Sequence, residues 1–327
     1  MQPFAFATAQ SAEAAVGRVA GTRGAAFIAG GTDMVQLLQD RVTAPSELID
    51  INQLPFANVD VDAGGVRIGA LARMADVADD PRIRARFPVV AESILLSASA
   101  QVRNMASIGG CLLQRTRCLY FRDVVTPCNK REPGSGCPAQ DGENRMNAIL
   151  GGSDHCIATY PGDLAVALVA LDADVRLSGV HGERTIPVEA LHRLPDDTPE
   201  IETALEPGDL ITAVVIPECA AAARSHYVKV RDRASFEFAL ASAAVAVEID
   251  DGTVRDARVA VGGVATKPWR LREVERALVG RRFDADVVHA AAARASDGAE
   301  PRGQNAFKVE LLKRTVARAL LTVGGLA

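Results

Sequence analysis

The first fifty residues change between helical and strand-like spacing of their apolar side chains. Apolar residues recur at helical spacing over 11–19, and short apolar runs at 25–29 and 47–51 are typical of buried strands. Between these runs, Gly-Gly-Thr-Asp at 30–33 leads into a helical pattern over 34–41. This order of strand, Gly-Gly turn and helix predicts a small α/β unit.

The rest of the chain continues with short apolar elements. Strands are predicted at 59–61, 65–70, 174–177, 210–216, 227–230, 239–249 and 254–261. Helices are predicted at 74–79, 88–98, 163–170, 270–278, 285–295 and 306–323. Asp-Asp-Gly at 250–252 separates two long apolar strands and predicts a hairpin. No apolar run reaches the roughly 18 residues that span a bilayer, so we expect no membrane insertion.

Length and composition narrow the class of protein. The chain has 327 residues, enough for two or three domains, and 48% of them are hydrophobic, enough for sizeable cores. Its net charge of −5 argues against a nucleic-acid-binding surface, which is usually basic. The amino terminus has neither the basic nor the apolar segment of a secretory signal. We therefore expect a chain that binds no nucleic acid and enters no oxidising compartment on its own signal.

Two Gly-Gly turns are candidates for phosphate binding. The first is the turn at 30–33, and the second lies at 107–111, in Ser-Ile-Gly-Gly-Cys. Glycine lets the backbone approach an anion closely, and a following helix start offers free N–H groups. A tight strand-to-helix turn without a ligand is the competing interpretation of either motif.

Four of the six cysteines lie in one segment rich in turn-forming residues. Cys118, Cys128, Cys137 and Cys156 are separated by nine, eight and eighteen residues. Four thiolates at such spacing can ligate an iron–sulfur cluster or a zinc ion. Zinc sites usually contain Cys-x-x-Cys pairs, and none occurs here. Disulfides, which need an oxidising compartment, and a chance grouping are the remaining interpretations.

These motifs together resemble the FAD-binding medium subunit of molybdenum hydroxylases, the family of xanthine dehydrogenase and carbon monoxide dehydrogenase. The resemblance covers essentially the whole chain and includes Thr-Tyr-Pro-Gly-Asp at 159–163. The cysteine segment, with its flanking sequences 114–118, 128–131 and 144–151, resembles the flavin subunit of periplasmic-type aldehyde oxidoreductases. In that subgroup an inserted loop carries a [4Fe–4S] cluster.

The resemblance implies an α+β fold. It implies an FAD-binding domain of the vanillyl-alcohol-oxidase/PCMH type over 1–218, with subdomains 1–52 and 53–218. The cysteine-rich loop would occupy about 111–158 of the second subdomain. A carboxy-terminal α+β domain of the CO dehydrogenase flavoprotein type would follow over 219–327.

The resemblance also implies the site residues. Cofactor binding is expected at Ala29, Gly30, Gly31, Thr32, Asp33, Ser107, Ile108, Gly109, Gly110, Cys111, Asp163 and Lys229. Cluster ligation is expected at Cys118, Cys128, Cys137 and Cys156. Cys111 departs from the family, which usually has Asn at this position. Asp163 is interpreted either as a helix cap or as a ribose contact, and Lys229 as a flavin contact or an edge charge. No residue of this chain is expected to be catalytic.

The implied function is electron transfer by a flavoprotein. A molybdenum cofactor on a large subunit would supply electrons to two [2Fe–2S] clusters on a small subunit. FAD on this chain would receive the electrons from these clusters and pass them to an external acceptor. The three subunits would form a heterotrimer or a dimer of heterotrimers. The implied location is cytoplasmic, or periplasmic by co-export with a signal-bearing partner. The alternative is a structural or assembly subunit that has no flavin activity and whose cysteine-rich loop is held together by zinc or by a cluster.

Overall fold

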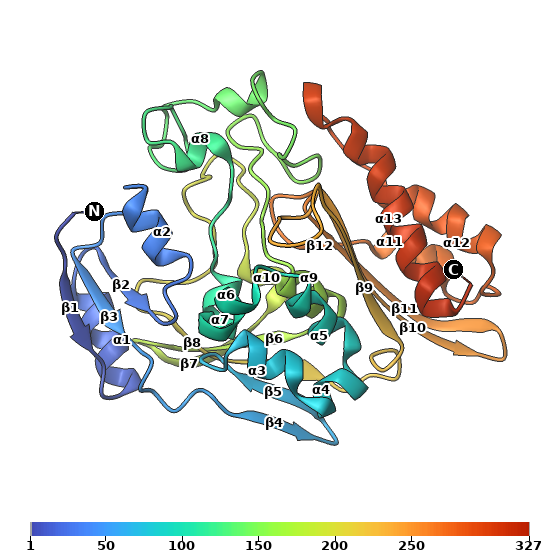
Figure 1. The fold of residues 1–327 in the computed structure, drawn as a ribbon, viewed down its shortest axis with the longest axis horizontal. Coiled ribbons are helices and arrows are strands. Elements are labelled where there is room, and N and C mark those ends of the chain that lie inside the picture. The colour runs from blue at the N-terminus through green and yellow to red at the C-terminus, as the bar shows by residue number, and fades with distance from the viewer. Residues whose placement is uncertain (1, 327) are drawn as a thin grey trace.

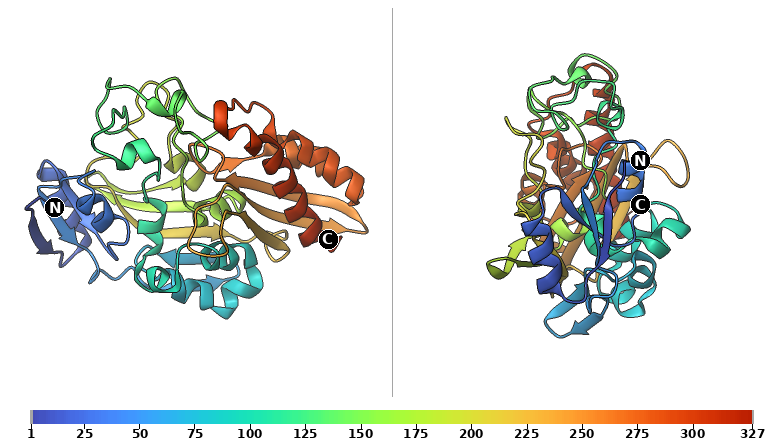
Figure 2. Two further views of the ribbon diagram at one scale, coloured as in Figure 1. Left: turned by 45° about the horizontal axis from the view of Figure 1, so that its top comes forward. Right: turned by 90° about the vertical axis from the view of Figure 1, so that its left-hand side faces the viewer.

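Three β-sheets follow one another along the chain in the computed structural model, which describes residues 2–326 (Figure 1). The amino-terminal sheet lies at one end, the carboxy-terminal sheet with its helices at the other, and the cysteine-rich loop stands above them. The left view of Figure 2 shows the same order, and the right view looks at the molecule from its amino-terminal end. Among residues 2–326, no helix has both the length and the apolar character that crossing a bilayer requires.

The amino-terminal unit is a three-stranded parallel sheet with two helices. Its elements are β1 (Ala5–Thr8), α1 (Ala12–Gly21), β2 (Ala25–Ile28), α2 (Met34–Gln39) and β3 (Glu47–Asp50). The strand order is β1-β3-β2, and both pairings are parallel. Ser11 caps α1 by accepting a hydrogen bond from the Ala14 amide at 3.2 Å. The predicted α/β unit is confirmed, with β1 as an additional edge strand.

The middle unit is a five-stranded antiparallel sheet covered by short helices. Its strands are β4 (Val59–Asp62), β5 (Gly65–Gly69), β6 (Asp174–Gly179), β7 (Gly182–Pro187) and β8 (Leu210–Pro217), in the order β4-β5-β8-β6-β7. Its helices are α3 (Met74–Asp79), α4 (Pro81–Arg86), α5 (Pro88–Leu95), α6 (Ala100–Met105), α7 (Ile108–Leu112), α9 (Leu164–Ala170) and α10 (Val188–Leu191). Because β8 lies between β5 and β6, it joins segments more than a hundred residues apart.

The carboxy-terminal unit is an antiparallel sheet with its own helices on one face and helices of the middle unit on the other. Its strands are β9 (Ser225–Val230), β10 (Ala241–Asp250), β11 (Thr253–Gly262) and β12 (Trp269–Arg270). Its helices are α11 (Arg272–Leu278), α12 (Ala285–Ala292) and α13 (Phe307–Gly324), with 3₁₀ turns at Ala293–Ser296 and Gly303–Asn305. Alternate residues of β10 join two different cores, Ala244 on the side of α5 and α9 and Val245 on the side of α13. Two covered faces explain why β10 is apolar almost throughout.

The predicted hairpin between β10 and β11 is confirmed. Asp250 pairs with Thr253 across a two-residue turn. Both turn residues adopt positive φ, 46° at Asp251 and 71° at Gly252, as a type I′ turn requires.

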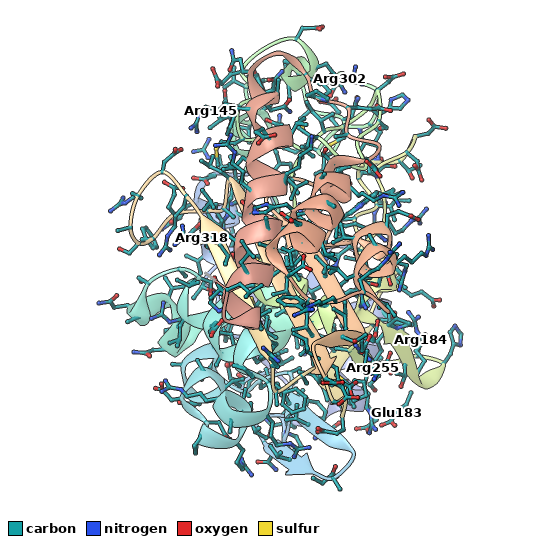
Figure 3. All side chains as sticks on the ribbon, turned by 90° about the vertical axis from the view of Figure 1, so that its right-hand side faces the viewer. Arg145, Glu183, Arg184, Arg255, Arg302 and Arg318 are labelled. Atoms are coloured by element: carbon teal, nitrogen blue, oxygen red, sulfur yellow. The ribbon has the colours of Figure 1, made fainter. Side chains whose placement is uncertain are left out.

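The cysteine-rich loop contains little regular structure. It includes α8 (Leu119–Arg122) and one 3₁₀ turn at Pro138–Gln140. Inside it, the Arg131 guanidinium donates to the carbonyl oxygens of Tyr120, Phe121 and Thr126, and so closes the loop on itself. Figure 3 shows Arg145 of this loop and Arg302 at the same end of α13. The Arg145 guanidinium lies 5.2 Å from the centre of the Phe307 ring.

A buried lysine attaches α13 to the end of the cysteine-rich loop. Lys308 is fully buried, and its Nζ donates to the carbonyl oxygens of Met146, Asn147 and Gly263 at 3.0, 3.1 and 2.7 Å. Burial lowers the pKa of Lys308 from 10.5 to about 7. In the unfolded chain, this amine stays protonated up to its ordinary pKa of 10.5, whereas in the folded chain it loses its proton above about pH 7. Between these two pH values, unfolding therefore takes up a proton. Raising the pH in that interval therefore favours the folded state.

We expect Lys308→Met to lower the free energy of unfolding by about 1–3 kcal/mol at pH 7, because three buried carbonyls lose their shared donor. The difference between the native chain and the variant should grow as the pH rises from about 7 to about 9. Urea unfolding of both chains at the two pH values measures it. If the difference in stability between the two chains did not change with pH, the conclusion that folded Lys308 loses its proton near pH 7 would be wrong.

Candidate flavin site and cysteine cavity

A cavity of about 760 Å³ lies where the amino-terminal unit, the middle unit and β9 meet. This volume is within the usual range for a cofactor site. Eleven of the twelve residues predicted for cofactor binding line it: Ala29, Gly30, Gly31, Thr32, Asp33, Ser107, Gly109, Gly110, Cys111, Asp163 and Lys229. The twelfth, Ile108, is fully buried in the core of the middle unit.

At this cavity, the first Gly-Gly turn is in direct contact with the residues that immediately precede the second. A Cβ atom at Gly30 would overlap the carbonyl oxygen of Met105, just before the second turn. Arg73 donates to the same carbonyl oxygen at 2.7 Å and to the Asn52 side chain at 2.9 Å, and Asn52 donates to the Ala29 carbonyl at 3.0 Å. Arg73 and Asn52 therefore hold the turns together. The sequence analysis missed both, because neither belongs to a motif and their partners are distant in the chain.

We expect Gly30→Ala to weaken FAD binding by about ten- to a hundredfold, since overfilling a close contact typically costs about 1–3 kcal/mol. Fluorescence quenching of added FAD measures the affinity. Gly17→Ala is the matched control, because a Cβ there meets nothing within 4 Å and the helix should gain stability. Unchanged FAD affinity in the Gly30 variant would show that the contact between the turns is irrelevant to binding.

The two turns differ in the availability of their amides. Within residues 2–326, the amides of 30–33 have no recorded hydrogen-bond acceptor. The amides of the second turn are used internally: Gly109 donates to the Ala70 carbonyl at 2.8 Å, and Gly110 to the Ser107 hydroxyl at 3.3 Å. The first turn is thus the one whose backbone can receive an anion, while the second shapes the wall.

Asp163 and Lys229 form a buried ion pair on the cavity wall. Their side chains are 5% and 1% exposed, and Lys229 Nζ lies 2.7 Å from Asp163 Oδ2. The Tyr227 hydroxyl donates to Asp163 Oδ1 at 2.9 Å, and Lys229 also donates to the Leu96 carbonyl at 3.2 Å. Burial raises the pKa of Asp163, and Lys229 and Tyr227 oppose that rise.

This pair corrects two local interpretations of the sequence. Asp163 stands at the N-cap position of α9, but its side chain makes no capping hydrogen bond. Lys229 is not a solvated edge charge, since it is almost fully buried against Asp163. The carboxylate pairs with a lysine of β9 in the carboxy-terminal unit and does not cap the helix that it begins.

Cys111 is a buried thiol at the base of the cavity. Burial raises its pKa to about 12, so it stays protonated at neutral pH. Its Sγ accepts a hydrogen bond from Gln114 Nε2 at 3.5 Å. A thiol in this setting fills space and does not act as a nucleophile.

The four cysteines of the loop line one small second cavity. Cys118, Cys128, Cys137 and Cys156 all contribute to its wall. All six cysteines of the chain are free thiols, so the disulfide interpretation is not supported. Among residues 2–326, no group of three His, Cys, Asp or Glu side chains is close enough together to hold a metal ion.

Two of these sulfur atoms accept hydrogen bonds. Asn147 Nδ2 donates to Cys118 Sγ at 3.6 Å, and the Ala158 amide donates to Cys156 Sγ at 3.4 Å. Burial raises the pKa of Cys156 to about 12, while the nearby Lys130 ammonium and the Ala158 amide oppose the rise. Metal binding there would have to release thiol protons, and these two donors would stabilise the thiolates of Cys118 and Cys156.

The basic residues of the loop are engaged in internal contacts. Arg115 and Lys130 share Glu202, at 2.8 and 3.4 Å, and Arg117 pairs with Asp33 at 2.7 Å. These cations are therefore not a free basic surface. They connect the cysteine-rich loop to the middle and amino-terminal units.

Comparisons with known proteins identify the class of protein that this fold and cavity define. The family described as the FAD binding domain in molybdopterin dehydrogenase matches residues 2–219, and the CO dehydrogenase flavoprotein C-terminal domain matches 225–323. The chain is 45% identical over 300 residues to the FAD-binding subunit of aldehyde oxidoreductase from Escherichia coli, covering 91% of each protein. It is 27% identical to the glyceraldehyde dehydrogenase medium chain of Sulfolobus acidocaldarius, covering 98% of each.

A solved structure of carbon monoxide dehydrogenase from Hydrogenophaga pseudoflava has the same fold, with a TM-score of 0.77, 26% identity and full coverage of both chains. The fold and the cavity thus define a flavoprotein. The chain belongs to the FAD-binding subunits of the molybdenum hydroxylase family. The predicted α+β fold, the FAD cofactor and the assignment as an FAD-dependent oxidoreductase subunit are confirmed.

Proposed function

We propose that this chain transfers electrons within a molybdenum-containing aldehyde oxidoreductase complex. Electrons would come from two [2Fe–2S] clusters on a small partner subunit, fed by a molybdenum cofactor on a large one, and leave to an external acceptor. The observation that carries the proposal is a flavin-sized cavity lined by both Gly-Gly turns, in a chain 45% identical to an aldehyde oxidoreductase FAD-binding subunit. FAD supplies the redox chemistry, because it exchanges electrons singly or in pairs.

We propose that the chain holds FAD through the predicted residues that line the cavity. The amides of 30–33 would receive the diphosphate, because they have no acceptor within the described chain. The hydroxyls of Thr32 and Ser107 can donate to the same group. Lys229, held in place by Asp163, would present a fixed positive charge to a reduced anionic flavin. Cys111 would contribute only its volume to the wall.

We propose that the second cavity holds a [4Fe–4S] cluster ligated by Cys118, Cys128, Cys137 and Cys156. Four cysteines that line one cavity, with amide donors to the sulfurs of two of them, support a site for thiolate-bound iron. Hydrogen bonds to the sulfurs are one means by which proteins set the reduction potential of such clusters.

We also propose the division into an FAD-binding domain over 1–218, with subdomains 1–52 and 53–218, and a second domain over 219–327. Each division contains one of the three sheets. The chain would work wherever its partners do, in the cytoplasm or, after co-export with a signal-bearing partner, in the periplasm.

Co-expression with the large and small subunits tests this function. We expect a heterotrimer, or a dimer of heterotrimers, whose flavin absorbance bleaches when an aliphatic or aromatic aldehyde is added anaerobically. A complex whose molybdenum centre turns over while the flavin stays oxidised would contradict the electron-transfer role. Recovery of a complex without flavin would favour the structural or assembly role instead.

A further inference from the structure

One carboxylate connects the first Gly-Gly turn to the beginning of the cysteine-rich loop. Asp33 stands at the N-cap position of α2, yet its side chain makes no capping hydrogen bond. Instead, its Oδ2 accepts from the Arg115 amide at 2.9 Å, and its Oδ1 from the Arg122 guanidinium at 3.0 Å. The Arg117 guanidinium forms an ion pair with the same Oδ1 at 2.7 Å. Three groups from a segment some eighty residues away thus converge on a residue of the flavin cavity.

The donors flank the first cysteine of the second cavity. Arg117 immediately precedes Cys118, and Arg122 ends α8, which follows it. Arg122 also donates to the Thr116 carbonyl at 2.9 Å, so it fixes the backbone that approaches Cys118. The position of Cys118 therefore depends on where Asp33 holds these two guanidinium groups.

Packing supports the same connection independently of charge. Leu37, one turn after Asp33 on α2, belongs to a small buried cluster with Phe121 and Cys128, against which Cys118 also packs. Arg117 adds a hydrogen bond to Gln36 of the same helix at 2.7 Å. The helix α2 thus has the flavin-facing turn at its start and the cysteine-rich loop along its side.

We propose that Asp33 is a positioning residue that makes FAD binding and the ordering of the cysteine-rich loop mutually dependent. This inference rests on the proposed FAD site. FAD on the turn at 30–33 fixes the start of α2, and Asp33 passes that restriction to the segment 115–122. A ligand that orders one segment lowers the free-energy cost of ordering a second segment that packs against the first. By the same coupling, ordering the second segment raises the affinity for the ligand.

Amide hydrogen exchange of residues 118–137 tests the coupling without requiring iron. Each full-length chain is measured alone and at an FAD concentration that saturates it. We expect FAD to slow exchange of this segment by about tenfold in the native chain, a usual size for coupling between sites. In Asp33→Asn the FAD-dependent slowing should fall to nearly none.

Glu47→Gln is the matched control. Glu47 is also a buried acid of the amino-terminal unit, and it pairs with Arg18, away from the cysteine-rich loop. This variant should keep the full FAD-dependent slowing, even if it lowers the stability of the unit. Equal slowing in the native chain and in Asp33→Asn, or none in the native chain, would overturn the proposal.

FAD affinity provides the reciprocal measurement. In the native chain, iron-loaded protein should bind FAD about tenfold more tightly than iron-free protein, and in Asp33→Asn this ratio should approach one. A chain that takes up no iron would refute the cluster, while hydrogen exchange would still decide the coupling. A chain that binds no FAD would overturn both the coupling and the proposed function.

Discussion

Cys156→Ser is expected to abolish the iron content of the chain and its cluster absorbance. Cys156 is buried on the wall of the second cavity, and its sulfur accepts a hydrogen bond from the Ala158 amide. A serine hydroxyl ionises far less readily than a thiol and is a harder ligand, so it would hold iron poorly. Iron analysis and visible absorbance of anaerobically purified chain measure the loss. FAD should be retained, although with weaker affinity if the coupling through Asp33 holds.

Cys219→Ser is the control for this experiment. Cys219 is half-buried beside the core of the middle unit and does not line the second cavity. Its replacement should leave iron and FAD unchanged. If Cys156→Ser retained as much iron as Cys219→Ser, the assignment of the four cysteines as ligands would be wrong.

Asp163→Asn is expected to lower the free energy of unfolding by about 3–5 kcal/mol, because it leaves the ammonium group of Lys229 buried without a counter-charge. Chemical unfolding of the flavin-free chain measures this effect apart from the ligand. The double variant with Lys229→Met should recover part of the loss, since the uncompensated charge is then gone. Both variants should bind FAD more weakly than the native chain.

Asp250→Asn is the matched control, because it removes the carboxylate of an exposed ion pair instead of a buried one. Asp250 pairs with Arg255 at 3.0 Å, but the two side chains are 68% and 53% exposed. Loss of this pair should cost less than about 1 kcal/mol. Equal effects of Asp163→Asn and Asp250→Asn would contradict the view that burial makes the Asp163–Lys229 pair critical.

Most elements could be predicted from the sequence because their signals are local. The hairpin of β10 and β11 follows from Asp-Asp-Gly between two apolar runs, and α13 follows from its helical periodicity. Short elements such as α8 and the edge strand β1 carry too few residues for a periodic signal. Phe6 of β1 is 60% exposed, so this strand also lacks a clear buried face.

The roles of the site residues depended on contacts that no local pattern contains. The capping preference of aspartate predicts that Asp33 and Asp163 serve the helices that they begin. In the folded chain both carboxylates bind basic groups that lie 66 to 89 residues further along the sequence. The motifs identified where the cavity is, but the tertiary fold determines how its charged groups are paired.

The most direct test of the account is to co-express the chain with its partners, purify it anaerobically, separate it from the iron-containing small subunit, and then measure its iron, zinc and FAD together. The account predicts about four iron atoms and one FAD per chain, with four cysteines as the ligands. Flavin without iron would refute the cluster and leave the flavin subunit intact. Zinc without flavin would contradict the central claim that this chain is an electron-transferring flavoprotein.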